Sequence, residues 1–217
     1  MGEDLIIAVD GPGGVGKSSV SRQVAEHFGL AHLDTGAFYR AAALAVLEAG
    51  VDLDDIDGAS AVVSGCTIDY AYGATTLNGD DVSRVIRSDA VTSAVSPVAA
   101  MPEVRVMMVE RQRAWVDARG RRAVVEGRDI GTVVFPDALL KVYLTADPEE
   151  RARRRAGESG GATSSVKEAL ERRDQIDSTR AVSPLSVAAG AVVIDTTHLT
   201  LPDVVDRVIA EVAARTA

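Results

Sequence analysis

The 217-residue chain contains few of the features that mark several large classes of protein. Its single cysteine, Cys66, excludes an internal disulfide and a cysteine-based metal site. No run approaches the roughly 18 to 20 consecutive apolar residues of a membrane-spanning helix, so we expect no membrane partner. The formal net charge of −9 argues against a nucleic-acid polymer as partner, because such proteins carry a basic surface.

Lysine is also scarce, because 20 of the 23 basic residues are arginine. The planar guanidinium suits bidentate recognition of phosphate and carboxylate groups, so the grouping of these arginines matters. An apolar content of 47 % suffices for the core of one α/β domain with an insertion. The acidic residues 1–4 lead directly into an apolar run, from which we expect no signal peptide and a cytoplasmic protein.

The stretch that organises the chain is LIIAVDGPGGVGKSSV, residues 5–20. Its apolar start predicts a buried parallel strand, and residues 17–28 are compatible with a helix. Between them lies the pattern G-x-x-x-x-G-K-[ST], whose glycines let backbone N–H groups converge on a phosphate. Lys17 then reaches the β- and γ-phosphates, and Ser18 binds Mg²⁺. A glycine-rich turn without a ligand is the alternative. The expected ATP-binding residues are Gly11, Pro12, Gly13, Gly14, Val15, Gly16, Lys17, Ser18 and Ser19.

Strands that alternate with helices predict a doubly wound sheet, in which ligands bind at the carboxyl ends of the strands. Asp34 and residues 126–129 follow two such strands. Residues 50–81 read as a small inserted subdomain with a hairpin turn at Asn78-Gly79. We expect parallel strands at 5–9, 30–34, 121–126, 139–144 and 191–195, short antiparallel strands at 66–72, 75–77 and 81–82, and helices at 17–28, 35–49, 59–64, 82–96, 102–118 and 202–214. Pro97 is expected to interrupt the helix before it.

Residues 148–180 form a charged helical hairpin, which we expect to be broken at glycine-rich residues 157–161. Its arginines lack a counter-charge until phosphates arrive, so a hinged lid over phosphates is one interpretation. A solvated surface hairpin is the other. His32 is expected at a strand or loop surface, with no metal site nearby.

Several separated blocks spread over nearly the whole chain are typical of one family: DGPGGVGKS (10–18), DTGAFYR (34–40), SPVAAMPEVR (96–105), QR (112–113), GRDIGTVVFP (127–136) and RAVSPL (180–185). Through these blocks the chain resembles the bacterial cytidylate kinases, a family of P-loop nucleoside monophosphate kinases. The resemblance implies a P-loop NTPase-type parallel sheet flanked by helices, with a core of residues 1–49, 82–147 and 181–217. A nucleoside-monophosphate-binding subdomain of about 50–81 and a lid of about 148–180 complete the expected single kinase domain.

The resemblance also assigns residue roles. It implies acceptor-phosphate contacts from Thr35, Arg40 and Arg128, and cytosine contacts from Ser96, Arg105 and Asp129. It further implies that Arg173 and Arg180 bind phosphates, that Asp177 lies near the ribose hydroxyls, and that Glu126 holds Mg²⁺ through a water. Thr35 stands where serine is more usual, and Glu126 where aspartate is common. The catalytic set is then Lys17, Arg128, Arg173 and Arg180.

The implied reaction moves the γ-phosphate of ATP to CMP or dCMP, giving CDP or dCDP and ADP, in a monomer. A P-loop kinase for another nucleotide or metabolite is an alternative, although it has no need of the base-reading set Ser96, Arg105 and Asp129. A nucleotide-dependent switch such as a GTPase is a second alternative. Guanine recognition there uses Asn-Lys-x-Asp, and the only asparagine of this chain is Asn78, in an expected turn.

Overall fold

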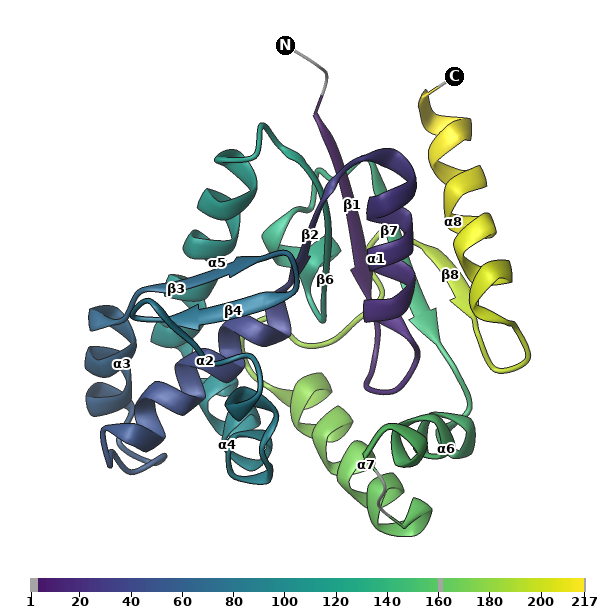
Figure 1. The fold of residues 1–217 in the computed structure, drawn as a ribbon. Coiled ribbons are helices and arrows are strands. Elements are labelled where there is room, and N and C mark those ends of the chain that lie inside the picture. The colour runs from purple at the N-terminus through teal and green to yellow at the C-terminus, as the bar shows by residue number, and fades with distance from the viewer. Residues whose placement is uncertain (1–3, 160–161, 217) are drawn as a thin grey trace. The chain divides into compact units, whose positions relative to one another are not determined.

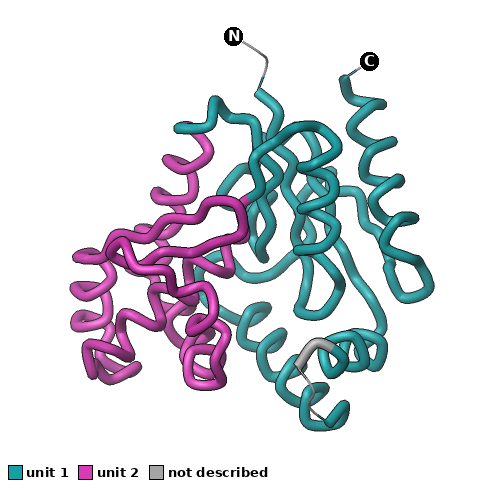
Figure 2. The backbone as a smooth tube through the Cα atoms, in the orientation of Figure 1, with its two compact units in different colours: residues 1–32, 118–217 teal, residues 33–117 magenta. Residues whose placement is uncertain are grey.

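The computed structural model describes residues 4–159 and 162–216 (Figure 1). The chain divides into two compact units, of which one is Leu33–Asp117 and the other combines Met1–His32 with Ala118–Ala217 (Figure 2). Each unit has its own sheet. Within the described residues, none of the helices has both the length and the apolar character needed to cross a bilayer.

The unit formed by the two chain ends is built on a five-stranded sheet with the order β2-β6-β1-β7-β8. β1 pairs in parallel with β6 and β7, and β7 pairs in parallel with β8. The strands are β1 (Leu5–Asp10), β2 (Ala31–Asp34), where the chain passes into the other unit, β6 (Arg122–Gly127), β7 (Leu140–Thr145) and β8 (Val192–Asp195). The predicted parallel strands are therefore confirmed.

Two helices, α1 (Lys17–Phe28) and α8 (Leu201–Thr216), pack on this sheet. They lie side by side (Figure 1). Val24 of α1 and Val208 of α8 share a buried apolar cluster with Val9 and Val142 of the sheet. Burying each such side chain stabilises the fold by about 1.5 to 3 kcal/mol before entropy costs. This packing anchors α1, and with it the loop that precedes α1. Both helices were predicted from the sequence.

The expected hairpin consists of α6 (Pro148–Ser159) and α7 (Thr163–Thr179). The break expected at residues 157–161 begins later than its first glycine, because α6 continues through Gly157 and ends at Ser159. One glycine inside a helix costs only about 1 kcal/mol relative to alanine, which the neighbouring helical residues offset. The last glycines of the expected break, 160 and 161, lie outside the described residues.

The second unit combines four helices with a small antiparallel sheet of order β3-β4-β5. Asn78 and Gly79 both have positive φ (53° and 95°), as a two-residue hairpin turn requires. Trp115 Nε1 donates to the Tyr70 carbonyl at 2.8 Å and ties α5 to β3. The elements are α2 (Thr35–Glu48), α3 (Ile56–Gly65), β3 (Ile68–Ala71), β4 (Ala74–Leu77), β5 (Asp80–Asp81), the 3₁₀ turn η1 (Val85–Arg87), α4 (Asp89–Ala100) and α5 (Pro102–Asp117).

The prediction of a helix over 82–96 that ends before Pro97 is wrong. α4 begins at Asp89, after Ser88 caps it through the Val91 N–H, and it includes Pro97. Proline removes one hydrogen-bond donor near the end of this helix, which costs little when a buried face holds the helix in place. Val95 and Val98 are buried on either side of Pro97, so packing extends the helix past the proline.

Candidate active site

The glycine-rich loop between β1 and α1 has the backbone that its sequence predicts. Gly11, Gly14 and Gly16 have φ of 147°, 78° and 88°, a region that other residues rarely adopt. A Cβ on Gly11 would lie 2.2 Å from the Leu144 carbonyl oxygen, so the loop also needs glycine for space. Gly16 caps the N-terminus of α1. The loop therefore presents backbone N–H groups at the positive end of a helix, where an anion binds favourably.

Lys17 folds back over this loop. Its Nζ donates to the carbonyl oxygen of Pro12 at 2.8 Å. The loss of water around the ammonium and the nearby positive charge of Arg128 lower the pKa of Lys17 to about 7. A phosphate group bound at the loop would oppose both effects, so this side chain is arranged to become fully charged when an anion arrives.

Glu126 lies at the carboxyl end of β6 and is held by two side chains. Ser18 Oγ donates to Glu126 Oε2 at 2.8 Å, and His32 Nε2 lies 3.0 Å from Glu126 Oε1. The expectation of a surface position for His32 is wrong, since its side chain is only 12 % exposed. The physical reason is the strand order, which places β2 next to β6. A sequence pattern does not specify that neighbour.

Ser18 and Glu126 together fit a magnesium ion that is also bound by a nucleotide. Among residues 4–159 and 162–216, no group of three or more His, Cys, Asp or Glu side chains is arranged to hold a metal alone. Mg²⁺ is commonly bound by one or two protein oxygens while substrate phosphates and waters complete its octahedron. The Ser18 hydroxyl at the start of α1 and the buried Glu126 carboxylate, which are hydrogen-bonded to each other, could supply these protein oxygens.

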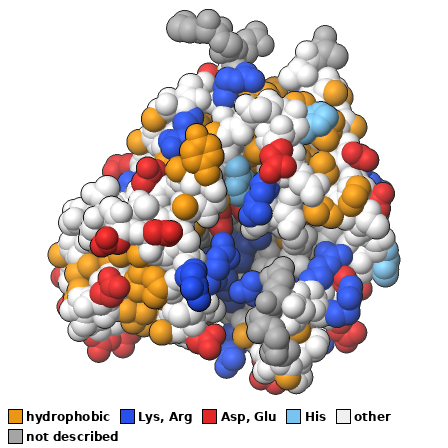
Figure 3. Space-filling view, viewed as in Figure 1, with side chains coloured by type: hydrophobic (Ala, Val, Ile, Leu, Met, Phe, Trp, Pro, Cys, Tyr) orange, Lys and Arg blue, Asp and Glu red, His pale blue; other side chains and the backbone are white. Residues whose placement is uncertain are grey.

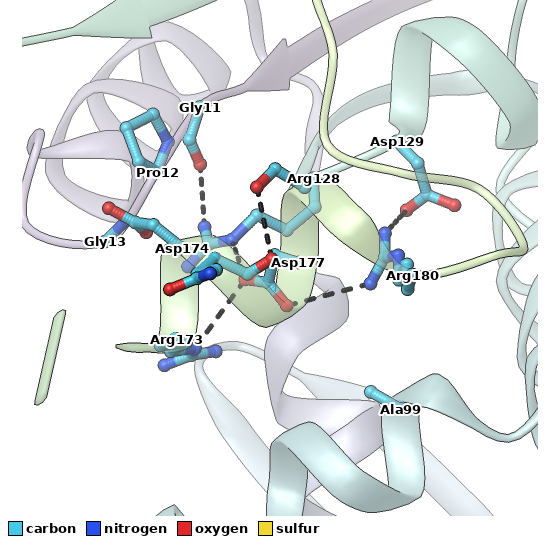
Figure 4. A network of polar contacts seen from close by, with 12 residues as sticks. Gly11, Pro12, Gly13, Ala99, Arg128, Asp129, Arg173, Asp174, Asp177 and Arg180 are labelled. Carbon is cyan, nitrogen blue, oxygen red and sulfur yellow. Dashed lines mark hydrogen bonds and ion pairs between the residues drawn. The ribbon is translucent and has the colours of Figure 1, made fainter. Parts of the chain in front are cut away.

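Arginines and carboxylates form a buried network beside the loop (Figure 4). Arg128 donates to Asp177 at 2.8 Å and to the Gly11 carbonyl at 2.7 Å. Arg173 and Arg180 lie 3.9 and 3.8 Å from Asp177, and Arg180 lies 3.8 Å from Asp129. Burial would raise the pKa of Asp177, but the surrounding arginines hold that pKa below its usual value. The network thus gathers three guanidinium groups around Asp177, and one of them, Arg128, also contacts the phosphate loop.

The expectation that these arginines lack counter-charges is therefore wrong. Sequence reasoning also missed a second ion pair, between Arg151 of α6 and Asp174 of α7. Asp174 accepts from the Gly13 N–H at 3.4 Å, and Arg151 donates to the Gly13 carbonyl at 3.2 Å. The spacing of the charged residues in and after α7 could have indicated this network. Residues 173, 174, 177 and 180 follow helical i,i+3 and i,i+4 steps, which place their side chains on one face of the helix.

Two further arginines of α6, Arg153 and Arg154, pair with Glu150 of the same helix. Glu150 accepts from Arg153 and from Arg154, both at 2.7 Å. Figure 3 shows Lys or Arg side chains beside Asp or Glu side chains over this helix. Surface pairs of this kind contribute little to stability, about 0 to 1 kcal/mol.

A buried aspartate that was not predicted positions Arg128 and Asp129. Asp10, at the end of β1, accepts from the N–H groups of Ile130 at 2.8 Å and Gly131 at 2.7 Å. These residues begin a π-helical turn, η2 (Ile130–Val134), directly after Asp129. Burial raises the pKa of Asp10 to about 6, against the opposing effect of the two N–H groups. Asp10 thereby fixes the turn that begins directly after Arg128 and Asp129, the two residues expected to contact the acceptor nucleotide.

Four residues that were predicted to bind the acceptor nucleotide lie in the second unit. Arg40 of α2 donates to Thr92 Oγ1 at 2.9 Å and to the Ile86 carbonyl at 3.0 Å. Arg105 of α5 is 1 % exposed, donates to the Ala99 carbonyl at 2.9 Å and lies 5.4 Å from the Tyr39 ring centroid. Thr35 and Ser96 are also buried. The structure thus gathers the loop, Glu126 and the Arg-Asp network in one unit, and it holds these four ligands in the other.

Comparison with known proteins gives one family. A family model described as cytidylate kinase matches residues 7–214. A curated cytidylate kinase from Nocardia farcinica is 50 % identical, with 97 % of each chain covered. One from Limosilactobacillus fermentum is 46 % identical, with 96 % of this chain and 95 % of the relative covered.

Solved structures with low identity support the fold alone. A gluconokinase from Sinorhizobium meliloti aligns with a TM-score of 0.51 at 16 % identity, over 97 % of this chain and 92 % of that one. A sugar kinase from Janibacter aligns with a TM-score of 0.53 at 13 % identity, over 97 % and 95 %. The family model matches nearly the whole chain, and the curated relatives are about half identical to it over nearly their full length. This chain therefore belongs to the cytidylate kinase family.

Proposed function

We propose that this protein transfers the γ-phosphoryl group of ATP to CMP or dCMP, giving CDP or dCDP and ADP. The observation that carries the proposal is the cluster of cations around the glycine-rich loop, in a chain of this family. Lys17 and Arg128 both bond to carbonyls of that loop, and Arg173 and Arg180 lie in the same network. Such a concentration of positive charge at a helix N-terminus suits a polyphosphate.

ATP is proposed to bind through the loop residues 11–19, with backbone N–H groups and Lys17 on its phosphates. Ser18 directly and Glu126 through a water would hold Mg²⁺, which neutralises charge between the β- and γ-phosphates when bound. The hydrogen bond between these two residues sets the hydroxyl and carboxylate oxygens side by side before any ligand arrives.

CMP is proposed to bind through the residues that match the acceptor-binding motifs of the family. Thr35, Arg40 and Arg128 would contact its phosphate, Asp177 its ribose, and Ser96, Arg105 and Asp129 its base. Cytosine offers an amino donor and two acceptors, which match one carboxylate and one guanidinium. Residues 50–81 would then act as the subdomain that encloses the nucleoside monophosphate.

In the reaction, a phosphate oxygen of CMP attacks the γ-phosphorus of ATP while the bond from that phosphorus to the ADP oxygen breaks in line. A phosphate nucleophile needs no strong general base, so the protein supplies alignment and charge neutralisation. Lys17, Arg128, Arg173 and Arg180 are the proposed catalytic cations. Because Asp177 already gathers three of these arginines, and Arg128 among them contacts the loop, little reorganisation is needed when phosphates replace the carboxylate contacts.

We also propose that residues 148–180 form a lid that closes over the phosphates. The protein is further proposed to act as a monomer in the cytoplasm. The pair of Arg151 and Asp174 joins α6 and α7 to Gly13, so phosphates that bind at the loop compete with this pair. Amide hydrogen exchange in α7 should slow when a bisubstrate analogue joining adenosine and cytidine binds. Exchange in α8, which lies on the sheet, serves as the internal reference. Unchanged exchange in α7 would identify the hairpin as a static surface element.

The acceptor is tested by ADP release from ATP·Mg²⁺ with CMP, dCMP, UMP, AMP or GMP as the second substrate. We expect CMP and dCMP to give the highest kcat/KM values, with UMP at least tenfold lower. A metabolite kinase would show equal and negligible rates with all five nucleotides, and that result would overturn the proposal.

A further inference from the structure

We propose that His32 is a positioning residue that holds Glu126 in the orientation needed for the nucleotide-bound magnesium ion. The inference rests on the proposed function, because it assumes a Mg²⁺-nucleotide complex at the glycine-rich loop. It concerns a side chain that no sequence motif places at this site. The central observation is that Glu126 is held at both of its oxygens from two different elements.

The geometry assigns a separate task to each oxygen. Oε2 accepts from Ser18 Oγ of α1 at 2.8 Å, and Oε1 lies 3.0 Å from His32 Nε2 of β2. An ionised carboxylate only accepts hydrogen bonds, so Nε2 carries the proton in this contact. With Oε1 held by His32, Oε2 stays directed at Ser18, the residue proposed to ligate the ion.

Burial makes this contact energetically relevant. The side chains of His32 and Glu126 are 12 % and 3 % exposed, so water has little access to replace the imidazole. A glutamate side chain has one more rotatable bond than an aspartate, and fixing it costs rotamer entropy. A hydrogen bond to a charged group offsets that cost and selects one rotamer before the nucleotide binds. Loss of the bond should therefore weaken magnesium-dependent binding in particular.

The test separates this role from simple packing of a histidine on β2. His32→Gln places an amide N–H near the position of Nε2, whereas His32→Asn is one methylene shorter and does not reach Glu126. Calorimetry without any acceptor measures the affinity for the β,γ-imido analogue of ATP, once with Mg²⁺ and once with EDTA. The ratio of the two affinities is the readout. His27→Gln, at an exposed position in α1, is the matched control.

We expect His32→Asn to lower the ratio by about tenfold, within the range for residues that orient metal ligands. His32→Gln should restore it to within about threefold, and His27→Gln should leave it unchanged. An unchanged ratio in His32→Asn, or an equal loss of both affinities, overturns the proposal. His32→Ala provides a second route if His32→Asn does not fold: it also removes the contact to Oε1, so it should lower the ratio, and an unchanged ratio in His32→Ala also overturns the proposal. Because no acceptor is present, a failure with CMP as substrate would not affect this result.

Discussion

Lys17→Ala should lower kcat by about 10²-fold or more while the protein remains folded. The substitution removes a cation directed at the transferring phosphoryl group, and lost transition-state charge contacts have effects of this size. In the nucleotide-free protein, Lys17 donates a hydrogen bond to a loop carbonyl, and burial disfavours its charged form, so the melting temperature should not fall. Steady-state kinetics and thermal unfolding measure the two expectations.

The same lysine predicts a pH dependence. Its pKa is lowered to about 7 in the folded protein, so between pH 7 and about 10.5 the folded state binds fewer protons than the unfolded state. Stability of the nucleotide-free protein should therefore gain a positive contribution as pH rises through this window, and Lys17→Ala should lack it. Binding of ATP near pH 8 should take up a proton, which calorimetry in buffers of different ionisation enthalpy detects.

Lys141→Ala is the matched control, because Lys141 Nζ also donates to the carbonyl of the residue five positions earlier, Pro136, at 3.0 Å. It should retain normal turnover and normal proton uptake. Near-normal kcat in Lys17→Ala would contradict the role given to this residue, and so would a loss of folding.

Asp129→Asn should reduce the preference for CMP over UMP, mainly through loss of CMP activity. Asp129 is 4 % exposed and faces Arg180, so its carboxylate sits in a site with little water. The 4-amino group of cytosine donates to such a carboxylate, whereas O4 of uracil leaves it without a proton. An unpaired buried acceptor costs about 1 to 3 kcal/mol, which corresponds to roughly tenfold or greater discrimination in the wild type.

Asp177→Asn is the matched control for Asp129, since both carboxylates lie 3.8 Å from Arg180. Asp177 is proposed to contact the ribose, so its substitution should lower kcat/KM for CMP and UMP by similar factors. The measurement is the CMP/UMP ratio of kcat/KM in each variant. If folded Asp129→Asn keeps the wild-type ratio, base recognition belongs to another residue.

The elements of the fold that depend on local patterns were predictable. The apolar run before the glycines specified β1, and the loop pattern specified the start of α1. Pro97 shows the limit of this approach: a local rule ends the helix there, but the buried face of α4 continues through Val98. Packing against neighbours decides such cases, and the neighbours come from distant parts of the chain.

In the candidate site too, local patterns predict some residues, while contacts between distant parts of the chain place the others. The motif gives the loop residues directly, since they are contiguous. Asp174 meets Gly13 across 161 positions of sequence, and His32 meets Glu126 across 94. These contacts follow from the order of strands in the sheet and from the packing of α7 beside the loop. Neither is encoded in a short pattern, which explains why both were missed.

This protein is expected to transfer the phosphoryl group directly from ATP to CMP. Phosphorus NMR of the protein with ATP, Mg²⁺ and CMP follows every phosphate in one experiment. We predict that CDP and ADP appear in equal amounts, without release of inorganic phosphate beyond the rate seen in the absence of protein. Formation of inorganic phosphate and ADP without CDP, or no change in any signal, would contradict the account.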